Sequence, residues 1–227
     1  MGSNAGAASN AESGYVNEGN VSINGGTVSN GVAGINVSYG TILNNTSGTV
    51  EVDNGAGLYA TNDSRIENKG TINVTGTGTG IAARGISETN GTPSFNYGNT
   101  GTIEILNSGN INAAGSNSIG IYAENNKGIA KSNVTVNNSG KIDITGDNAV
   151  GIAVKGNNNS GGIVRLSGTG NSDIKVGKEG IGVYTENSDI NINSDYGIET
   201  GDNGVGIYTD SSLTSNNTLN FKYSGST

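Results

Sequence analysis

A short segment, glycine followed by alternating aliphatic residues, recurs seven times along this chain and restricts its fold more than any other feature. The copies read VAGINV, GAGLYA, GTGIAA, SIGIYA, AVGIAV, GIGVYT and GVGIYT. Their aligned glycines are Gly34, Gly57, Gly80, Gly120, Gly151, Gly182 and Gly206. Self-similarity at a period of roughly 20 to 50 residues is typical of solenoids, in which each repeat stacks on its neighbours. The sequence therefore predicts a stack of structural repeats.

A second motif, asparagine, one residue and glycine, alternates with the first. It occurs in VNEGNVSI, ENKGTINV, LNSGNINA and NNSGKIDI, and NTSGTVEV is a variant with one extra residue. Each repeat then reads as three short segments in which apolar residues occupy every second position, a period that indicates strands. No apolar stripe with helical spacing occurs. We predict an all-β fold, a right-handed three-stranded parallel β-helix of about seven coils with no helices of note.

The alternation also predicts which side chains point inward. On the first strand of two repeats the predicted inward residues are Ile119, Ile121 and Ala123, and Val205, Ile207 and Thr209. The predicted outward residues there are Gly120, Tyr122 and Tyr208. The asparagines of the second motif stack as Asn17, Asn68, Asn107 and Asn138. Because buried polar groups need partners, we expect these amides to bond to one another in an inward ladder.

Composition supports a thin core and excludes several functions. Only 32% of the 227 residues are hydrophobic, whereas 40 are glycine and one is proline. A net charge of −8 without a basic run argues against nucleic acid and against an anionic membrane surface as partners. The chain contains no cysteine and no histidine, so disulfides, thiolate chemistry and the commonest metal ligand are excluded.

The chain divides into two parts in this interpretation. Residues 1–12 are predicted to be a leader or a disordered N-terminus. Residues 13–227 form one β-helix segment excised from a longer rod, because strand patterns are already established at Tyr15 and continue to Phe221. The longest coil carries an insertion loop at residues 84–101, which contains Phe95 and Tyr97. These two aromatic residues either contribute to recognition, as loop residues often do, or fold back onto the rod.

A β-helix can carry an enzyme that cleaves polysaccharide, so its carboxylates matter. The outward positions of the third strand are Ser22, Glu51, Asn73, Asn112, Asp143 and Lys175, with Glu199 as a further candidate. No two acids are neighbours in this column, and we expect Asp143 to pair with Lys175 on a solvated face. Four acids near the end of the chain, Asp195, Glu199, Asp202 and Asp210, suggest calcium, but the spacing of an EF-hand is missing. We predict no catalytic residues, no metal and no cofactor.

Tyrosines line the outward position of the first strand. The stripe consists of Tyr59, Tyr122, Tyr184 and Tyr208, with Asn36, Ala82 and Ala153 at the intervening positions. Exposed tyrosines have a flat apolar face and a polar tip, which suits contact with sugars and with proteins. The alternative is a stacked aromatic ladder that stabilises the rod, or simple β-propensity. The stripe, Phe95 and Tyr97 are the candidate partner-binding residues.

The recurring GIYA and NSGTI segments resemble the passenger regions of type V secretion autotransporters, most closely the large fusobacterial outer-membrane adhesins. The resemblance covers residues 15–221. It implies a non-enzymatic adhesin segment at the cell surface that attaches to a host-cell glycan, a host surface protein or another bacterial cell, without membrane contact by this segment. Two alternatives stay open, namely a β-helical polysaccharide lyase or hydrolase and a purely structural spacer.

Overall fold

The computed structural model describes residues 14–23, 33–38, 40–61, 63–85, 102–125, 134–156, 162–168, 173–193, 195–210 and 219–221. In these ranges the chain forms three parallel sheets, of seven, eight and seven strands, and no helix. Successive coils contribute one strand to each sheet, so strands that are neighbours in space belong to neighbouring repeats. The predicted three-stranded parallel β-helix is therefore confirmed.

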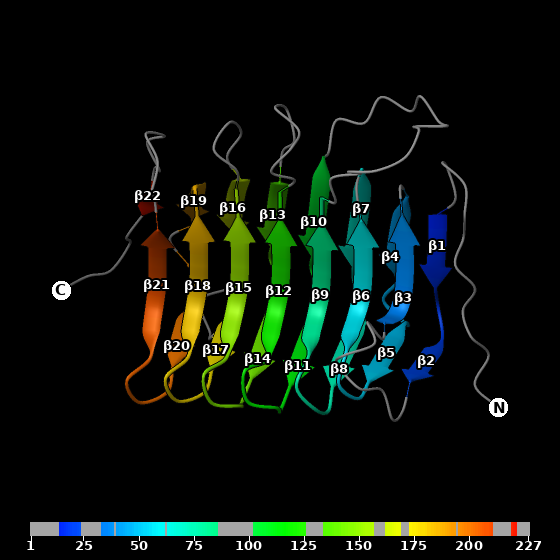
Figure 1. Ribbon diagram of the computed structural model, residues 1–227, viewed down its shortest axis with the longest axis horizontal. Helices are drawn as coiled ribbons and strands as arrows, with labels where there is room; N and C mark the ends of the chain where they lie inside the picture. The colour runs from blue at the N-terminus through cyan, green and yellow to red at the C-terminus, as the bar shows by residue number, and fades with distance from the viewer. Residues whose placement is uncertain are drawn as a thin grey trace, which may run out of the picture.

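The first sheet holds the glycine-aliphatic segments. Its strands are β3 (Ala33–Ser38), β6 (Ala56–Thr61), β9 (Thr79–Arg84), β12 (Ile119–Glu124), β15 (Val150–Lys155), β18 (Ile181–Glu186) and β21 (Val205–Asp210). This sheet faces the viewer in Figure 1 with its strands pointing up. The chain then passes behind to the second sheet and advances from right to left, which makes the β-helix right-handed (Figure 1).

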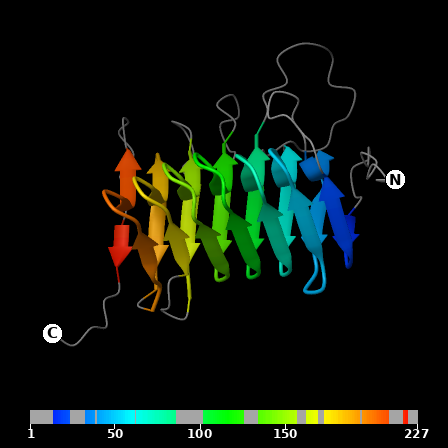
Figure 2. The same cartoon turned by 90° about the horizontal axis from the view of Figure 1, so that it is seen from below.

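The second and third sheets complete each coil, and Figure 2 shows the strands side by side along the rod. The second sheet comprises β1 (Gly14–Asn17), β4 (Thr41–Asn44), β7 (Ser64–Asn68), β10 (Ile103–Asn107), β13 (Val134–Asn138), β16 (Gly162–Leu166), β19 (Ser188–Ile192) and β22 (Leu219–Phe221). The third comprises β2 (Asn20–Ile23), β5 (Thr49–Val52), β8 (Thr71–Val74), β11 (Asn110–Ala113), β14 (Lys141–Ile144), β17 (Ile174–Val176) and β20 (Ile198–Thr200).

The core is a column of β-branched and other aliphatic side chains from all three sheets. In one coil Ile121 from the first sheet, Val136 from the second and Ile142 from the third are at most 1% exposed. The register places Ile81 and Ile152 on either side of Ile121, so the same side-chain type repeats from coil to coil. Each buried aliphatic side chain contributes about 1.5–3 kcal/mol by leaving water. The core is narrow, and stability is the sum over many similar coil-to-coil contacts.

The inward and outward assignment of the first strand is correct for Ile121, Tyr122 and Ala123 but wrong at its start. Gly120 faces inward, because a Cβ atom added there would lie 2.5 Å from Cγ2 of Ile142. Ile119, predicted to be inward, is half-buried instead. Strict alternation therefore breaks at the glycine, where two successive residues are buried. The glycine is required because the third strand of the coil leaves no room for a side chain at that point.

The same correction applies to the last copy of the segment. Val205 was predicted to be inward but is 42% exposed, since it lies in the same column as Ile119. Thr209 was also predicted to be inward and is exposed. Ile207 packs against the core as predicted. Because β21 is the terminal strand of its sheet, nothing described covers its outer edge, which explains the exposure of Thr209.

The corner between the third and first strands is built from residues in the left-handed region. Four of these are asparagines, with φ values between 54° and 60°, at Asn54, Asn117, Asn148 and Asn203. Asparagine tolerates this conformation better than most residues, which explains its recurrence just before the glycine-aliphatic segment. The corresponding corner before β18 holds Glu179 at φ 57°.

The corner after the second strand contains the predicted asparagine ladder, with one member more than expected. The buried amides are those of Asn17, Asn44, Asn68, Asn107 and Asn138. Each Nδ2 donates to the Oδ1 of the next coil, at 2.8, 2.7, 2.7 and 2.6 Å in chain order. Asn44 was not aligned with the other asparagines because its motif has one extra residue before the glycine. The register places Asn44 beside Asn68.

The ladder ends on a residue that the sequence motif did not indicate. Nδ2 of Asn138 donates to the hydroxyl of Tyr196 at 2.5 Å. Burial raises the pKa of Tyr196, so its hydroxyl remains protonated and neutral. In the next coil the position of Asn138 is taken by Leu166, and in the one after by Ile192. The corner after the second strand is thus polar up to the coil of Asn138 and apolar in the next two coils.

Candidate binding face on the first sheet

The predicted tyrosine stripe exists as one straight column on the outside of the first sheet. The register joins Asn36, Tyr59, Ala82, Tyr122, Ala153, Tyr184 and Tyr208 in that order. Ala82 and Ala153 are only 8% and 5% exposed although they lie on the outer side. Each of these alanines has a tyrosine on both sides in register. The column is therefore a row of large and small residues with little solvent between them.

Tyr122 is held in place by a three-residue cluster. Its hydroxyl donates to Oε2 of Glu124 at 2.7 Å. The same oxygen accepts from Nη2 and Nε of Arg84, at 2.9 and 3.1 Å, and the guanidinium carbon lies 6.0 Å from the centre of the Tyr122 ring. Burial alone raises the pKa of Glu124, but the bonds from Tyr122 and Arg84 outweigh it and hold that pKa below its usual value. This part of the face is ordered and internally paired.

Tyr184 and Tyr208 form the other ordered part of the stripe. Their rings stack with 5.7 Å between centroids and an interplanar angle of 7°. The hydroxyl of Tyr184 lies 3.5 Å from Oε2 of Glu186, and burial is the first cause of a raised pKa at Tyr184. Tyr208 is 47% exposed, one of the most exposed large apolar side chains among the described residues. The stripe is thus most accessible at its C-terminal end.

An ionic column runs beside the tyrosines and was not identified from the sequence. The register joins Thr61, Arg84, Glu124, Lys155, Glu186 and Asp210. Nζ of Lys155 lies 3.7 Å from Glu186, and Arg84 pairs with Glu124 at 2.9 Å. The signal was present in the sequence, since these residues occupy the second position after each stripe residue. From Arg84 to Glu186, bases and acids alternate along one side of the column of tyrosines and alanines.

An aliphatic column flanks the tyrosines on the other side. It consists of Ala33, Ala56, Thr79, Ile119, Val150, Ile181 and Val205. Of these, Ile119, Val150 and Ile181 are half-buried, and Val205 is exposed. Sequence reasoning missed this column because strict alternation assigned it to the core. Together with the tyrosines it forms an apolar band across β12, β15, β18 and β21, which we call the apolar band.

On the second and third sheets, the carboxylates of Glu67, Glu104 and Glu199 are paired with bases. The third-strand column predicted from the sequence is correct, including Glu199 beside Lys175. The predicted ion pair between Lys175 and Asp143 is wrong in its partner, because Nζ of Lys175 contacts Oε1 of Glu199 at 3.0 Å. The Glu199 contact, more than the neighbouring Asp143, raises the pKa of Lys175.

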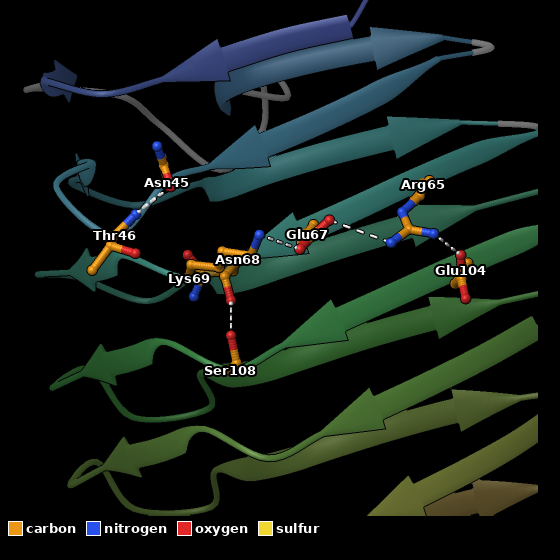
Figure 3. A network of polar contacts seen from close by, with 8 residues as sticks. All are labelled: Asn45, Thr46, Arg65, Glu67, Asn68, Lys69, Glu104 and Ser108. Carbon is orange, nitrogen blue, oxygen red and sulfur yellow. Dashed lines mark hydrogen bonds and ion pairs between the residues drawn. The ribbon is translucent and has the colours of Figure 1, made fainter.

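The second sheet carries a denser charged network (Figure 3). Arg65 lies between two acids, 3.3 Å from Glu67 and 2.8 Å from Glu104. Lys69 contacts the other oxygen of Glu67 at 2.7 Å, and its hydrogen bond is the leading cause of a lowered pKa at Glu67. These groups are partly exposed and already paired, so they offer a solvated surface and no uncompensated charge.

The four acids near the end of the chain do not converge. Glu199 lies on the third sheet and Asp210 on the first. Asp195 and Asp202 lie in exposed turns. Over the part of the chain that the structure describes, no group of three or more histidine, cysteine, aspartate or glutamate side chains is arranged to hold a metal ion. The predicted candidates Phe95 and Tyr97, with most of the insertion loop at residues 84–101, lie outside the described residues.

Two further findings bear on function. Within the described ranges no helix is long and apolar enough to cross a membrane. Comparison of the chain with protein-family models, with curated proteins and with solved structures finds no match. The candidate functional site is therefore the outer face of the first sheet, which carries the apolar band and the ionic column.

Proposed function

We propose that this chain is a non-enzymatic segment of a cell-surface adhesin, a β-helical rod of an autotransporter passenger. In this proposal the first sheet presents its outer face to a host-cell glycan, a host surface protein or another bacterial cell. The observation that carries the proposal is the apolar band, in which half-buried aliphatic residues and tyrosines align over β12, β15 and β18 and lead to the exposed Val205 and Tyr208 of β21. Contiguous exposed apolar surface with a charged margin is typical of protein interaction sites.

The geometry of a β-helix suits this role. Each coil adds about 4.8 Å of length and repeats the same outward columns, so a rod both spaces and multiplies a contact surface. The tyrosines supply flat, rigid faces that lose little conformational entropy on binding. The resemblance of the repeated segments to autotransporter passengers supports placing such a surface outside the cell.

The first experiment compares attachment of the purified chain to host cells, bacterial cells and a glycan array with that of a variant carrying Tyr122→Ser, Tyr184→Ser and Tyr208→Ser. We expect attachment of the variant to fall about tenfold, as for the loss of interface aromatic residues. The matched control carries Thr135→Ala and Asn137→Ala, outward residues of the second sheet, and should attach like the wild type. A separate deletion of residues 86–99 measures the contribution of the insertion loop.

Unchanged attachment in both the tyrosine variant and the loop deletion would contradict the proposal. If the wild-type chain attaches to nothing in these assays, the structural spacer becomes the better interpretation. One observation favours the spacer, because the stacked rings of Tyr184 and Tyr208 also fit an aromatic ladder that stabilises the rod.

One observation favours the second candidate function, an enzyme acting on polysaccharide. Glu186 and Asp210 are neighbours in register, so two carboxylates lie side by side next to the stacked tyrosines. However, glycoside hydrolysis needs carboxyl groups on both sides of the bond that breaks, whereas these two extend from the same face of one sheet. Release of reducing ends from a glycan by the purified chain, and its loss in Glu186→Gln, would establish the enzyme.

A further inference from the structure

The outer face of the first sheet alternates in two of its columns at once. From β9 to β18 the column of tyrosines and alanines alternates small and large side chains, and the ionic column alternates bases and acids. All four strands have a neighbour on either side, since β6 and β21 flank them. The pattern is therefore a property of interior coils. Its rows are Ala82 with Arg84, Tyr122 with Glu124, Ala153 with Lys155, and Tyr184 with Glu186.

A pattern of this kind is complementary to itself when it is read backwards. A two-fold axis between β12 and β15, parallel to the strands and in the plane of contact, brings the first sheets of two antiparallel rods face to face. Strand β12 then lies opposite β15 of the second copy, and β9 lies opposite β18 of the second copy. Such a contact uses the same patch on both copies.

Under this symmetry every charge of the four rows lies opposite a charge of the other sign. Glu124 faces Lys155 of the second copy, and Arg84 faces Glu186 of the second copy. Within one copy Arg84 pairs with Glu124 at 2.9 Å and Lys155 with Glu186 at 3.7 Å, and these side chains are 19% to 52% exposed. Neighbouring charges thus have opposite signs both along each column and across the contact.

The same axis matches the sizes of the side chains. Tyr122 lies opposite Ala153 of the second copy, and Tyr184 lies opposite Ala82 of the second copy. The rings of the two copies therefore interleave and do not meet end to end. Because Ala82 and Ala153 are only 8% and 5% exposed, each incoming ring contacts the tyrosines that flank the alanine.

The aliphatic column completes the contact but leaves it small. Ile119 of one copy faces Val150 of the other, and both are half-buried in the single chain. Four strands of six residues cover about 20 Å by 19 Å, at about 3.3 Å per residue and 4.8 Å per strand. This footprint is below the roughly 800 Å² per partner of a stable complex, so we expect weak, reversible association. Many copies on one surface strengthen such a contact through effective concentration.

Other arrangements of two copies match the pattern less well. Sliding the second copy by one coil places Glu124 opposite Glu186 in one direction and Arg84 opposite Lys155 in the other. Sliding it by two coils leaves Lys155 or Glu124 without a counter-charge. Parallel rods place the ionic column of one copy on the aliphatic column of the other, so charged groups lose water without gaining partners.

We propose that the outer face of the first sheet binds a second copy of this chain, antiparallel and face to face, with the two-fold axis between β12 and β15. This deepens the proposed attachment function, because it names the same chain on another cell as the partner, and it rests on that function for the location at the surface. A foreign partner needs charges of alternating sign about 4.8 Å apart. A second copy has this spacing because it is built from the same coils.

A neutral glycan fits this face less closely. Stacking on a sugar uses an open aromatic face, but one side of each ordered ring is already covered. The ring of Tyr184 stacks on that of Tyr208, and the guanidinium of Arg84 lies over the ring of Tyr122. A neutral glycan also offers no counter-charges to the ionic column. A second copy therefore matches the face better.

Sedimentation equilibrium of the whole chain tests the association. We expect a reversible monomer–dimer equilibrium with a dissociation constant of about 100 μM. Lys155→Glu alone sets acids opposite acids, and Glu124→Lys alone sets bases opposite bases, so each variant should dimerise about tenfold more weakly or less. An equimolar mixture of the two variants restores every opposite pair and should associate as tightly as the wild type. Their net charges are −8 − 2 = −10 and −8 + 2 = −6, so overall attraction does not explain this rescue.

Matched controls make the same chemical changes on the third sheet. Lys175→Glu and Glu51→Lys should dimerise like the wild type, and circular dichroism checks that all variants retain their strand content. A wild-type chain that stays monomeric at about 1 mM, well above the expected dissociation constant, overturns the proposal. A mixture of Lys155→Glu and Glu124→Lys chains that stays as monomeric as its components, or controls that dimerise as weakly, also overturns it.

A second pair of variants tests the register without changing any charge. Ala153→Tyr sets two rings opposite each other and should weaken dimerisation about tenfold. Adding Tyr122→Ala to it restores one large and one small residue at each contact and should restore the dimer. Equal dimerisation of the single and the double variant contradicts an axis between β12 and β15.

The outcome is separable from that of the attachment proposal. If the chain attaches to host cells or glycans but stays monomeric at about 1 mM, the adhesin stands and the second copy as partner is wrong. If the chain dimerises with the expected charge rescue but attaches to no cell or array, the contact between copies stands and the adhesin proposal fails.

Discussion

The interior coils and the last coils of this rod share their sequence motifs but place them under different constraints. At the corner after the second strand, Asn107 makes buried bonds to two other amides, whereas Leu166 holds the equivalent position two coils later. On the first sheet, a Cβ atom at Gly151 would lie 2.6 Å from Cγ2 of Ile174, whereas one at Gly206 would meet nothing within 4 Å. What a repeat contributes to stability therefore depends on the coil above and below it.

The largest difference is expected at the asparagine corner. Asn107→Leu should lower the free energy of unfolding by about 4 kcal/mol, because it leaves Nδ2 of Asn68 and Oδ1 of Asn138 buried without partners at about 1–3 kcal/mol each. Guanidinium denaturation measures the loss. The control Asn137→Leu makes the same chemical change at the outward neighbour and should alter stability by about 0.5 kcal/mol or less. Similar losses in both variants would contradict a special role for the ladder.

The glycines of the first sheet give a matched pair with nearly identical sequence surroundings. Gly151→Ala should cost about 2–3 kcal/mol, because the new methyl group overlaps Ile174 and the backbone of Gly182. Gly206→Ala should cost nothing and can gain about 0.5 kcal/mol, since it restricts the unfolded chain without creating a clash. Thermal unfolding followed by circular dichroism separates them. A comparable loss in the two variants would show that β21 is covered like an interior strand.

Tyr196 marks the boundary between the two kinds of corner. Tyr196→Phe should lower the free energy of unfolding by about 1 kcal/mol, because the buried Nδ2 of Asn138 loses its bond to the hydroxyl and keeps only the carbonyl oxygen of Gly140 at 3.1 Å. Tyr208→Phe removes an exposed hydroxyl and should be neutral in the same denaturation experiment. If both are neutral, the ladder does not depend on a terminal acceptor.

The smallest effect is expected at the corner before the first strand. Asn117 and Asn148 adopt the left-handed conformation in the interior coils, and Glu179 does so in a later coil. Glu179→Asn should raise the free energy of unfolding by about 0.5–1 kcal/mol, because this conformation costs an ordinary residue more than asparagine. The reciprocal change, Asn148→Glu, should lower it by a similar amount. Opposite signs in calorimetric melting temperatures are the expected result, and equal signs would contradict it.

The fold was predictable because its signals were periodic. Repeated glycines set the coil length, and alternation over short segments set the strand type, so the three columns of core residues followed. Alternation failed at Gly120, which faces the core next to the buried Ile121 because Ile142 leaves no room for a side chain at Gly120. That failure concealed the apolar band, since Ile119 and its equivalents were assigned to the core.

The candidate site was only partly predictable. The tyrosine column depends on register alone, and register follows from aligning the repeats. Arg84 pairs with Glu124, and Lys175 pairs with Glu199 and not with Asp143. These partners depend on side-chain conformations between neighbouring coils, which the repeat alignment does not give. Tyr196 was out of reach for the same reason, because its hydroxyl meets an asparagine 58 residues away.

The asparagine ladder also gives the rod a net dipole along its axis. Each amide from Asn17 to Asn107 donates to the next coil, and each amide from Asn44 to Asn138 accepts from the coil before it. The small dipoles therefore add along the axis, with the positive end at Asn138. The buried carboxylate of Asp173 acts on Tyr196, the group that receives this last bond. Coils of this kind are consequently not interchangeable, since a coil on the Asn138 side must offer an oxygen and a coil on the Asn17 side must offer a hydrogen.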